Sequence, residues 1–269
     1  ENAPFRVATA THCGHDRRGR ILMENGQPYP DDFPLIAADF RKKKPIYWTT
    51  GVIRDKYYLV PRYCNSLDAD LLKKEFKGEV ITFGEMVKRK YISVRKGDEV
   101  GSEAYGSGDI PFVRTSDISN LEITTDPTKS VSDEIFKKYS KGQNIQEGDI
   151  LMVADGRYRI GKTAIVLGNP VRYVVQSHLK IIKVTDKAPL SAFELLYILN
   201  LPMVQRQIRN LIFIQSTLGS LGNRLNELLL PIPERTPEWL DKVGNFEQML
   251  KQRHTLMQKI RAFQGEEII

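Results

Sequence analysis

GDIPFVRTSDIS, residues Gly108 to Ser119, is the stretch that decides the fold, and a weaker copy of it follows later in the chain. We call the two copies the first and the second box. In each box a Gly-Asp turn leads into an apolar run, Ile110–Val113 or Ile150–Val153, and polar residues come next, Arg114–Asp117 or Asp155–Gly156. Glycine permits the left-handed backbone of a tight turn, and aspartate accepts hydrogen bonds from the turn's own amides. Rigid folds present recognition groups at the ends of strands, but a salt-bridged structural corner explains Arg114–Asp117 equally well from the local pattern.

The surrounding residues, 76–235, show β-type runs separated by Gly, Asp, Asn and Pro turns. Strands are expected at Val80–Phe83, Ile110–Arg114, Ile150–Val153, Thr163–Val166, Val171–Val175 and Leu179–Val184. Helices are expected at Asp133–Tyr139, Ser191–Asn200 and Pro202–Leu211. We therefore predict an α+β domain with a mixed, mainly antiparallel twisted sheet and flanking helices.

Residues 1–75 differ from this domain because they lack long periodic segments. A short helix is expected at Leu35–Arg41, a strand at Tyr57–Val60 and a second helix at Asp68–Phe76. The chain also begins at Glu1, so we expect a fragment of a longer protein, with residues 1–75 as a tail or the remnant of a larger domain.

Residues 236–269 are expected to form a long helix of coiled-coil type. Apolar residues recur there at alternating spacings of three and four, interrupted only by Arg253: Trp239, Val243, Phe246, Leu250, Met257 and Ile260. Such a stripe requires a second helix, so we predict a spacer or dimerisation helix that binds a partner. A terminal helix packed on its own domain is the alternative.

Composition limits the class of protein. The 269 residues include 40 Lys and Arg against 33 Asp and Glu, a formal net charge of +7 that is compatible with a polyanionic partner. Only Cys13 and Cys64 are present, without metal-ligand spacing, which indicates reduced thiols and a cytoplasmic protein. No apolar run is long enough for a membrane span, and the first residues lack a signal pattern.

Catalytic constellations are largely missing from the sequence. His12, Cys13, His15 and Asp16 share one loop, but adjacent ligands without a distant second pair suit zinc poorly. His178 and His254 are isolated, and we interpret His178 as structural. The carboxylates Asp31 and Asp39 faintly resemble a nuclease metal site, which keeps a metal-dependent endonuclease as a weak alternative. We predict no catalytic residue and no metal site.

Nucleic-acid binding has more support because cations and aromatic residues alternate in two clusters. The first contains Lys88–Tyr91, Arg95 and Lys96, and the second contains Arg157–Arg159 and Lys162. Cations neutralise phosphates, whereas positioned polar side chains recognise base edges. Solvated charge on strand edges is the alternative for any single residue.

Five stretches, taken in order, resemble the target recognition domain of type I restriction-modification specificity subunits. They are GDIPFVRTSDI at Gly108–Ile118, EGDILMVADGRYRIGKTAIV at Glu147–Val166, QSHLKIIKV at Gln176–Val184, YILNLPMVQRQIR at Tyr197–Arg209 and QSTLGSLGNRLNELLLPIP at Gln215–Pro233. The resemblance implies recognition of one part of a split double-stranded DNA site. It also implies a spacer helix after Thr236 that sets the distance to a second domain and docks on a methyltransferase.

The resemblance also implies which residues face DNA. With the cation clusters, the candidates are Lys90, Arg95, Arg114, Thr115, Ser116, Asp117, Arg157, Tyr158, Arg159 and Lys162. The family's second box is usually an Asp-Gly, a small residue and Ile-Gly, whereas here Arg157–Arg159 is inserted before Ile160. We expect this loop to be specific to the target of this protein, and the glycines and aspartates of the boxes to be scaffold.

The N-terminal part resembles the last part of adenine-specific DNA methyltransferases, through FRVATATHCGHDRRG at Phe5–Gly19 and YYLVPRYCN at Tyr57–Asn65. The family's adenine-pocket motif and its S-adenosylmethionine motif are absent from this chain. The resemblance thus implies a non-catalytic specificity part of a methylase-specificity fusion, with S-adenosylmethionine bound by the missing part or by a partner.

Sequence-specific recognition of double-stranded DNA, directing adenine methylation to a defined site, is therefore the expected function. The expected partners are DNA, a methyltransferase domain or subunit, a restriction subunit where the system restricts, and a second copy through the C-terminal helix. The alternative from another class is an assembly subunit with incidental DNA contact.

Overall fold

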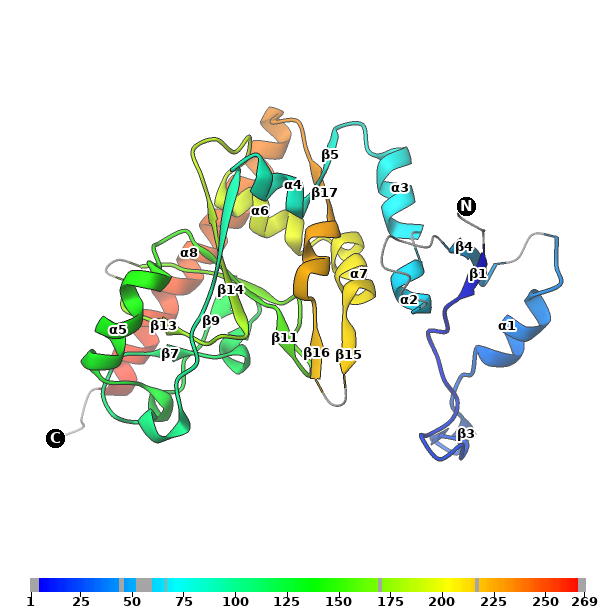
Figure 1. The fold of residues 1–269 in the computed structure, drawn as a ribbon, viewed down its shortest axis with the longest axis horizontal. Helices are drawn as coiled ribbons and strands as arrows, with labels where there is room; N and C mark the ends of the chain where they lie inside the picture. Colours follow the sequence, from blue (N-terminus) through cyan, green and yellow to red (C-terminus); the bar gives the residue numbers. More distant parts are fainter. Residues whose placement is uncertain are drawn as a thin grey trace. The chain divides into compact units, whose positions relative to one another are not determined.

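A computed structural model of the chain describes residues 5–43, 46–51, 60–65, 67–168, 171–215 and 218–265 (Figure 1). The chain forms two compact units, Glu1–Leu71 and Leu72–Ile269, with helix α3 (Leu67–Glu75) crossing the boundary. Among the described residues, no helix combines the length and the apolar character needed to cross a membrane.

The first unit contains short elements. Strands β1 (Phe5–Ala8) and β4 (Trp48–Gly51) pair antiparallel, and β2 (Met23–Glu24) and β3 (Gln27–Pro28) form a hairpin. The helices are α1 (Phe33–Asp39) and α2 (Pro61–Cys64). The predicted helices Leu35–Arg41 and Asp68–Phe76 are confirmed in α1 and α3, with shifted ends. Of the predicted strand Tyr57–Val60, residues 57–59 lie outside the described residues.

A four-stranded antiparallel sheet forms the centre of the second unit. Its order is β12 (Thr163–Ile165), β10 (Ile150–Val153), β14 (Leu179–Val184) and β6 (Ile92–Lys96). All four residues of β10 are buried, because this strand lies inside the sheet and both of its faces are covered. The predicted α+β class with a mainly antiparallel sheet is confirmed.

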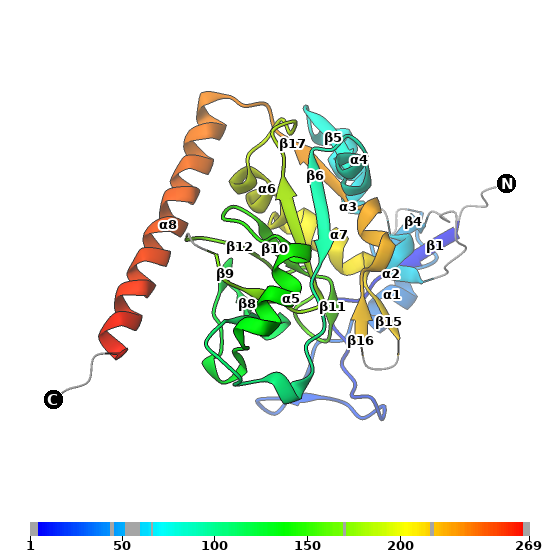
Figure 2. The same ribbon diagram turned by 60° about the vertical axis from the view of Figure 1, so that its left-hand side comes forward.

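Four smaller sheets surround the central one. β7 (Phe112–Val113) pairs parallel with β13 (Val174–Val175), while β5 (Glu79–Thr82) with β17 (Leu229–Ile232), and β8 (Ile118–Ser119) with β9 (Glu122–Ile123), pair antiparallel. The fourth small sheet has three strands, in the order β11 (Asp155–Gly156), β16 (Leu218–Ser220) and β15 (Phe213–Gln215). Figures 1 and 2 both show these three strands next to one another.

The helices of the second unit begin where the sequence provides caps or proline. They are α4 (Phe83–Lys88), α5 (Asp133–Gln143), α6 (Ala192–Leu199), α7 (Pro202–Leu211) and α8 (Pro237–Gly265), with short 3-10 turns η1 (Ser102–Ala104), η2 (Thr115–Asp117), η3 (Pro127–Lys129) and η4 (Gly222–Glu227). The Ser191 hydroxyl accepts from the Glu194 amide, and the Glu194 carboxylate accepts from the Ser191 amide, which is a capping box at α6.

The structure differs from the prediction at several strands, and the strand expected at Val171–Val175 is reduced to β13. The strand expected at Val80–Phe83 ends at Thr82, because the Thr82 hydroxyl accepts from the Glu85 amide and starts α4. The strand expected at Ile110–Arg114 is reduced to β7, since the chain turns into η2 after Val113. Strand β6 was not predicted, because charged residues in Lys88–Lys96 hid its alternating pattern.

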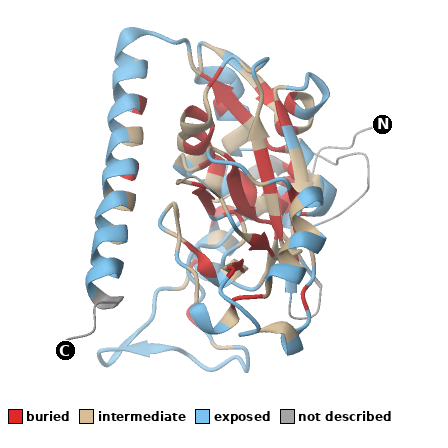
Figure 3. Cartoon of the chain, turned by 90° about the vertical axis from the view of Figure 1, so that its left-hand side faces the viewer, coloured by how far each residue is buried: buried red, intermediate tan, exposed pale blue. Residues whose placement is uncertain are grey.

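The core joins the central sheet to the stretch Gly108–Ser119. Val113 and Ile118 are fully buried with Leu151, Val153 and Ile181 in one cluster. Figure 3 shows the buried strands in red and the largely exposed helix α8 beside them. The apolar half of the stretch therefore anchors it to the sheet, and its polar half follows directly.

Candidate nucleic-acid interface

The polar half of the first box forms a salt-bridged corner. The Arg114 amide donates to Asp117 Oδ2 at 2.9 Å, and Arg114 Nη2 lies 3.3 Å from both Asp117 Oδ1 and Asp126 Oδ2. Asp117 is buried, and the Ser116 hydroxyl also donates to it at 2.9 Å. Arg114 and Asp117 therefore form the salt-bridged structural corner that was one of the two interpretations, and their charges neutralise each other.

The turn Gln176–His178 holds this corner to the second box. The Thr115 amide donates to Gln176 Oε1 at 3.3 Å, and the Gln176 amide donates to the Val113 carbonyl at 2.8 Å. On the other side, the His178 carbonyl accepts from the Ala154 amide at 2.9 Å. His178 Nδ1 lies 3.8 Å from Asp155 Oδ2. One turn thus connects the ends of β7 and β10.

The inserted loop after Asp155–Gly156 carries exposed cations and an exposed aromatic ring of the candidate set. Arg159 Nη1 donates to the Ile118 carbonyl at 2.8 Å, which fixes the loop to the first box. Arg157 and Tyr158 are exposed, Tyr158 by 89%, and Lys162 is exposed beside them. Within the described part of the chain, the side chains of these three form no hydrogen bond or ion pair, so they are free to bind a ligand.

A β-hairpin completes this surface. β16 pairs with β11, opposing Ser220 to Asp155, and the Leu221 amide donates to the Ala154 carbonyl at 3.0 Å. Arg224 stacks on the Phe213 ring, 3.8 Å from its centroid, and donates to the Ser220 carbonyl at 2.7 Å. Four segments distant in sequence therefore meet here: η2, the loop 155–162, the turn 176–178 and the hairpin β15–β16. We call this the four-segment surface.

Two candidate cations lie away from the four-segment surface. The Lys90 carbonyl accepts from the Thr185 hydroxyl at 2.6 Å, beyond the end of β14, whereas Gln176–His178 precedes the start of β14. Arg95 Nη2 donates to Asp149 Oδ2 at 3.1 Å, and Asp149 precedes β10. Burial raises the pKa of Asp149, although the Gln146 amide and the Arg95 guanidinium oppose this shift. Arg95 is thus the partner of a buried carboxylate.

Residues 78–248 match the family model of the type I restriction modification DNA specificity domain, over more than half of the chain. The chain belongs to this family. Specificity domains are the non-catalytic components that recognise DNA sequence in type I restriction-modification systems. The matched residues include every segment of the four-segment surface.

Three solved structures are similar in part. The type I restriction-modification S subunit from M. genitalium is 15% identical with a TM-score of 0.46, over 70% of this chain and 44% of that chain. The HsdS subunit from Thermoanaerobacter tengcongensis is 19% identical with a TM-score of 0.39, over 74% and 45%. A chain from a structure of a type I restriction-modification system, described for its complex assembly and conformational transition, is 18% identical with a TM-score of 0.41, over 72% of this chain and 46% of that chain. The chain spans less than half the length of these proteins. No curated protein matches the sequence.

Sequence reasoning missed two segments of the four-segment surface in the specificity domain. Of the turn Gln176–His178, only His178 was interpreted, as a structural residue, and the hairpin β15–β16 was not predicted. A signal for the turn was present, since three polar residues interrupt two apolar runs at a strand-to-strand connection. The hairpin had only the short pattern Phe213–Gln215 before a Ser-Thr pair, which local propensity does not distinguish from a loop.

The predicted partner stripe of α8 packs largely on the specificity domain itself. Trp239 Nε1 donates to Glu194 Oε1 at 2.8 Å, and the Tyr197 ring meets Trp239 and Phe246 edge-on at 5.5 and 5.4 Å. Val243 and Leu250 are buried. The alternative of a terminal helix packed on its own domain therefore describes these residues, because α6 occupies the place of the expected partner helix.

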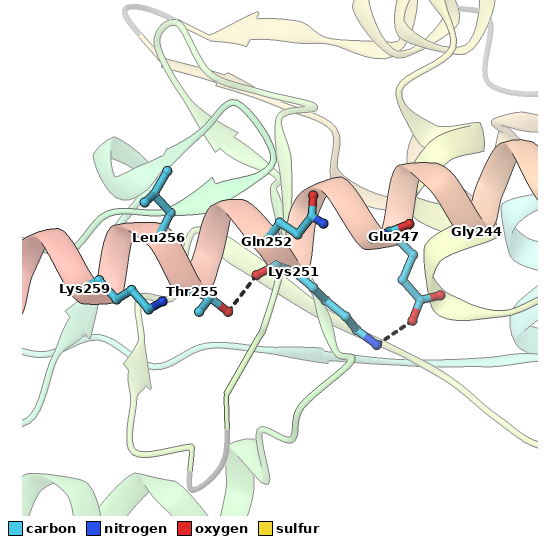
Figure 4. A pocket seen from close by; sticks show the side chains of 8 residues that line it. Gly244, Glu247, Lys251, Gln252, Thr255, Leu256 and Lys259 are labelled. Atoms are coloured by element: carbon cyan, nitrogen blue, oxygen red, sulfur yellow. Dashed lines mark hydrogen bonds and ion pairs between the residues drawn. The ribbon is translucent and has the colours of Figure 1, made fainter.

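Further along α8, Met257 lines a small hollow with Leu121 and Tyr173, while Arg253 forms an ion pair with Glu122 at 3.6 Å. Ile260 is exposed. A different face of α8, from Gly244 to Lys259, forms an open depression lined by α8 residues (Figure 4). There Lys251 pairs with Glu247 at 2.6 Å, so this face is mainly polar.

The N-terminal loop residues lie in a hydrogen-bonded arrangement. Asp32 accepts from the Thr11 hydroxyl at 2.8 Å and from the Thr11 and His12 amides, and these bonds lower its pKa to about 2. Asp31 lies 3.4 Å from His15, and Asp39 accepts from the Ile46 amide at 2.7 Å. In the described ranges, no three His, Cys, Asp or Glu side chains gather closely enough to hold a metal ion.

Proposed function

We propose that the four-segment surface is where the specificity domain recognises double-stranded DNA, and that this recognition directs adenine methylation to a defined site. The observation that carries the proposal is the convergence of η2, the loop 155–162, the turn 176–178 and the hairpin β15–β16. Strand pairing and hydrogen bonds join the described residues of all four segments without DNA, so we expect the surface to be preformed. A preformed surface loses less conformational entropy on binding.

The residues of this surface divide into two roles. Arg114 and Asp117 hold the corner, and Arg159 holds the loop to it through the Ile118 carbonyl. Arg157 and Lys162 are exposed and supply positive charge for phosphates or guanine edges. Tyr158 supplies an exposed aromatic ring beside them. We thus assign DNA contact to the inserted loop, whereas the first box holds the surface in its conformation.

Selection from a random pool of duplexes, using the intact 269-residue chain, tests the proposal. We expect one enriched sequence, and the affinity for it should fall steeply as salt rises because phosphate binding releases counterions. Equal affinity for the enriched duplex and for a scrambled duplex would remove the claim of sequence recognition. Lys90→Ala is the matched control, since Lys90 is an exposed cation outside the four-segment surface.

The finer assignment of the chain follows from the sequence resemblances. Residues 1–75 are the C-terminal end of an adenine methyltransferase, 76–235 the target recognition domain, and 236–269 the spacer helix. S-adenosylmethionine binds to the methyltransferase part or subunit and not to this chain. Titration calorimetry should therefore detect no S-adenosylmethionine binding by the chain alone, and heat of binding once the methyltransferase part is joined to it.

Partner subunits follow from the same proposal: a methyltransferase, a restriction subunit where the system restricts, and a second copy of the chain. Such a module acts on chromosomal DNA in the cytoplasm. One observation favours a protein-binding role for α8, since Met249, Leu256 and Phe263 expose apolar side chains outside its packed stripe. Analytical ultracentrifugation of the chain with and without the methyltransferase tests it, and a monomer in both samples would contradict it.

A further inference from the structure

The hairpin β15–β16 exposes apolar side chains on both of its faces. Ile214 is 69% exposed and Leu218 is 51% exposed. The register opposes Ile214 to Gly219 and Gln215 to Leu218, and directly opposed residues share a face. Ile214 and Leu218 therefore project to opposite sides of the hairpin. Packing a single face of the hairpin on the domain therefore cannot bury both side chains.

The base of the hairpin, in contrast, is held firmly. Arg224 stacks on Phe213 and donates to the carbonyls of Leu211 and Ser220, at 2.9 and 2.7 Å. On the face of Gly219, a Cβ atom would lie 2.8 Å from Ile160 Cδ1, so the inserted loop packs closely there. A hairpin with a fixed base and the exposed apolar side chains of Ile214 and Leu218 is suited to inserting into a binding partner.

The inserted loop places positive charge alongside the exposed apolar side chain of Leu218. β11 and β16 are antiparallel, with Asp155 opposite Ser220 and Gly156 opposite Gly219. The chain therefore leaves β11 in the direction of Leu218, and its next residues are Arg157 and the exposed Tyr158. Lys162 follows on the same loop. A fitting partner therefore has negative charge along the edges of its binding site and apolar groups at the centre of that site.

The major groove of duplex DNA has this combination. Phosphates line its rims, it admits a two-stranded β-ribbon, and the thymine C5-methyl group is the apolar group that it displays. We propose that the paired strands β15 and β16 enter the major groove and place Ile214 and Leu218 against thymine methyl groups. This inference rests on the proposed function, since it specifies how the four-segment surface recognises bases.

Uracil in place of thymine tests the proposal, because it removes the methyl group and keeps the base pair. The intact chain is first used to select its duplex, and each thymine of that duplex is then replaced singly by uracil. Affinity should fall about fourfold where a methyl-sized group is lost from an apolar contact. Leu218→Ala or Ile214→Ala should bind the thymine duplex more weakly and lose the sensitivity to uracil at one position.

Val87→Ala is the control, since Val87 is also an exposed apolar residue, 37%, but lies on α4. It should keep both the affinity and the sensitivity to uracil. Thermal unfolding of the three variants should match that of the wild type, as the replaced side chains are exposed. The comparison of thymine and uracil duplexes with wild-type protein needs no variant, so it stands even where a variant unfolds.

Several outcomes would overturn the proposal. Specific binding that is indifferent to uracil at every position, or a selected site without thymine, would exclude thymine methyl recognition. Unchanged DNA affinity of Leu218→Ala, combined with lost binding to a methyltransferase, would make the hairpin a protein-docking element. A selection that enriches no sequence would instead remove the proposed function itself, and this inference with it.

Discussion

Arginines of the two boxes have different surroundings, and their effects on folding and on DNA binding should separate. Arg114 is bonded to a buried carboxylate and to Asp126, whereas Arg157 is exposed and its side chain forms no hydrogen bond or ion pair within the described residues. The local sequence pattern left the two interpretations of Arg114 equal, because a corner salt bridge and a recognition group use the same residue types, and the family resemblance favoured DNA contact. Only the positions of Asp117 and Asp126 decide between them.

Arg114→Ala should lower the free energy of unfolding by about 1.5 to 3 kcal/mol, because Asp117 loses charge-assisted hydrogen bonds. Arg157→Ala should leave unfolding nearly unchanged and reduce the slope of log affinity against log salt by about 0.9 for one lost phosphate contact. Urea denaturation and a salt series of DNA titrations measure the two. An unchanged stability of Arg114→Ala would contradict the structural role.

Asp32 makes the N-terminal unit sensitive to acid. The folded-state pKa of Asp32 is lowered to about 2, from the usual aspartate value of 3.8, so the stabilisation that its carboxylate provides is fully present above the usual value. It is lost as pH falls through the lower value, when the carboxylate must be protonated. Circular dichroism between pH 5 and pH 2 should show a transition that shifts to higher pH in Thr11→Ala. An identical transition in both proteins would contradict this assignment.

At the scale of elements, helix α8 shows what the heptad-like pattern can and cannot predict. The spacing of Trp239, Val243 and Phe246 predicted one apolar face correctly. The pattern could not identify the partner of that face, because α6 within the chain and a helix from another chain present the same chemistry. The strands of the central sheet were mostly predicted, since their apolar runs are unbroken, while β6 was concealed by its charges.

Leu250→Ala and Met249→Ala are neighbouring changes on α8 with different expected effects. Leu250 is 6% exposed, so its truncation should cost about 2 kcal/mol or more by leaving a cavity. Met249 is 61% exposed, so its truncation should stay within about 0.5 kcal/mol. Chemical denaturation compares them, and equal losses would mean that α8 does not pack on its domain.

The whole molecule brings together residues that the sequence separates widely. Gly108–Ile118, the loop 155–162, the turn 176–178 and the strands β15 and β16 meet through strand pairing and through backbone and side-chain hydrogen bonds. Local propensity contains no information about such pairings, so the boxes were visible in the sequence but their common surface was not. The specificity-domain family covers all four segments, which agrees with one recognition unit.

Comparison of selected DNA sequences tests this account most directly. Duplexes would be selected from one random pool by the wild-type chain, by Arg157→Ala with Tyr158→Ala, and by the control Lys90→Ala. The account predicts one enriched sequence for the wild type, the same sequence for the control, and relaxed preference at one or more positions for the loop variant. An unaltered sequence for the loop variant, with unaltered affinity, would contradict the placement of DNA recognition on the four-segment surface.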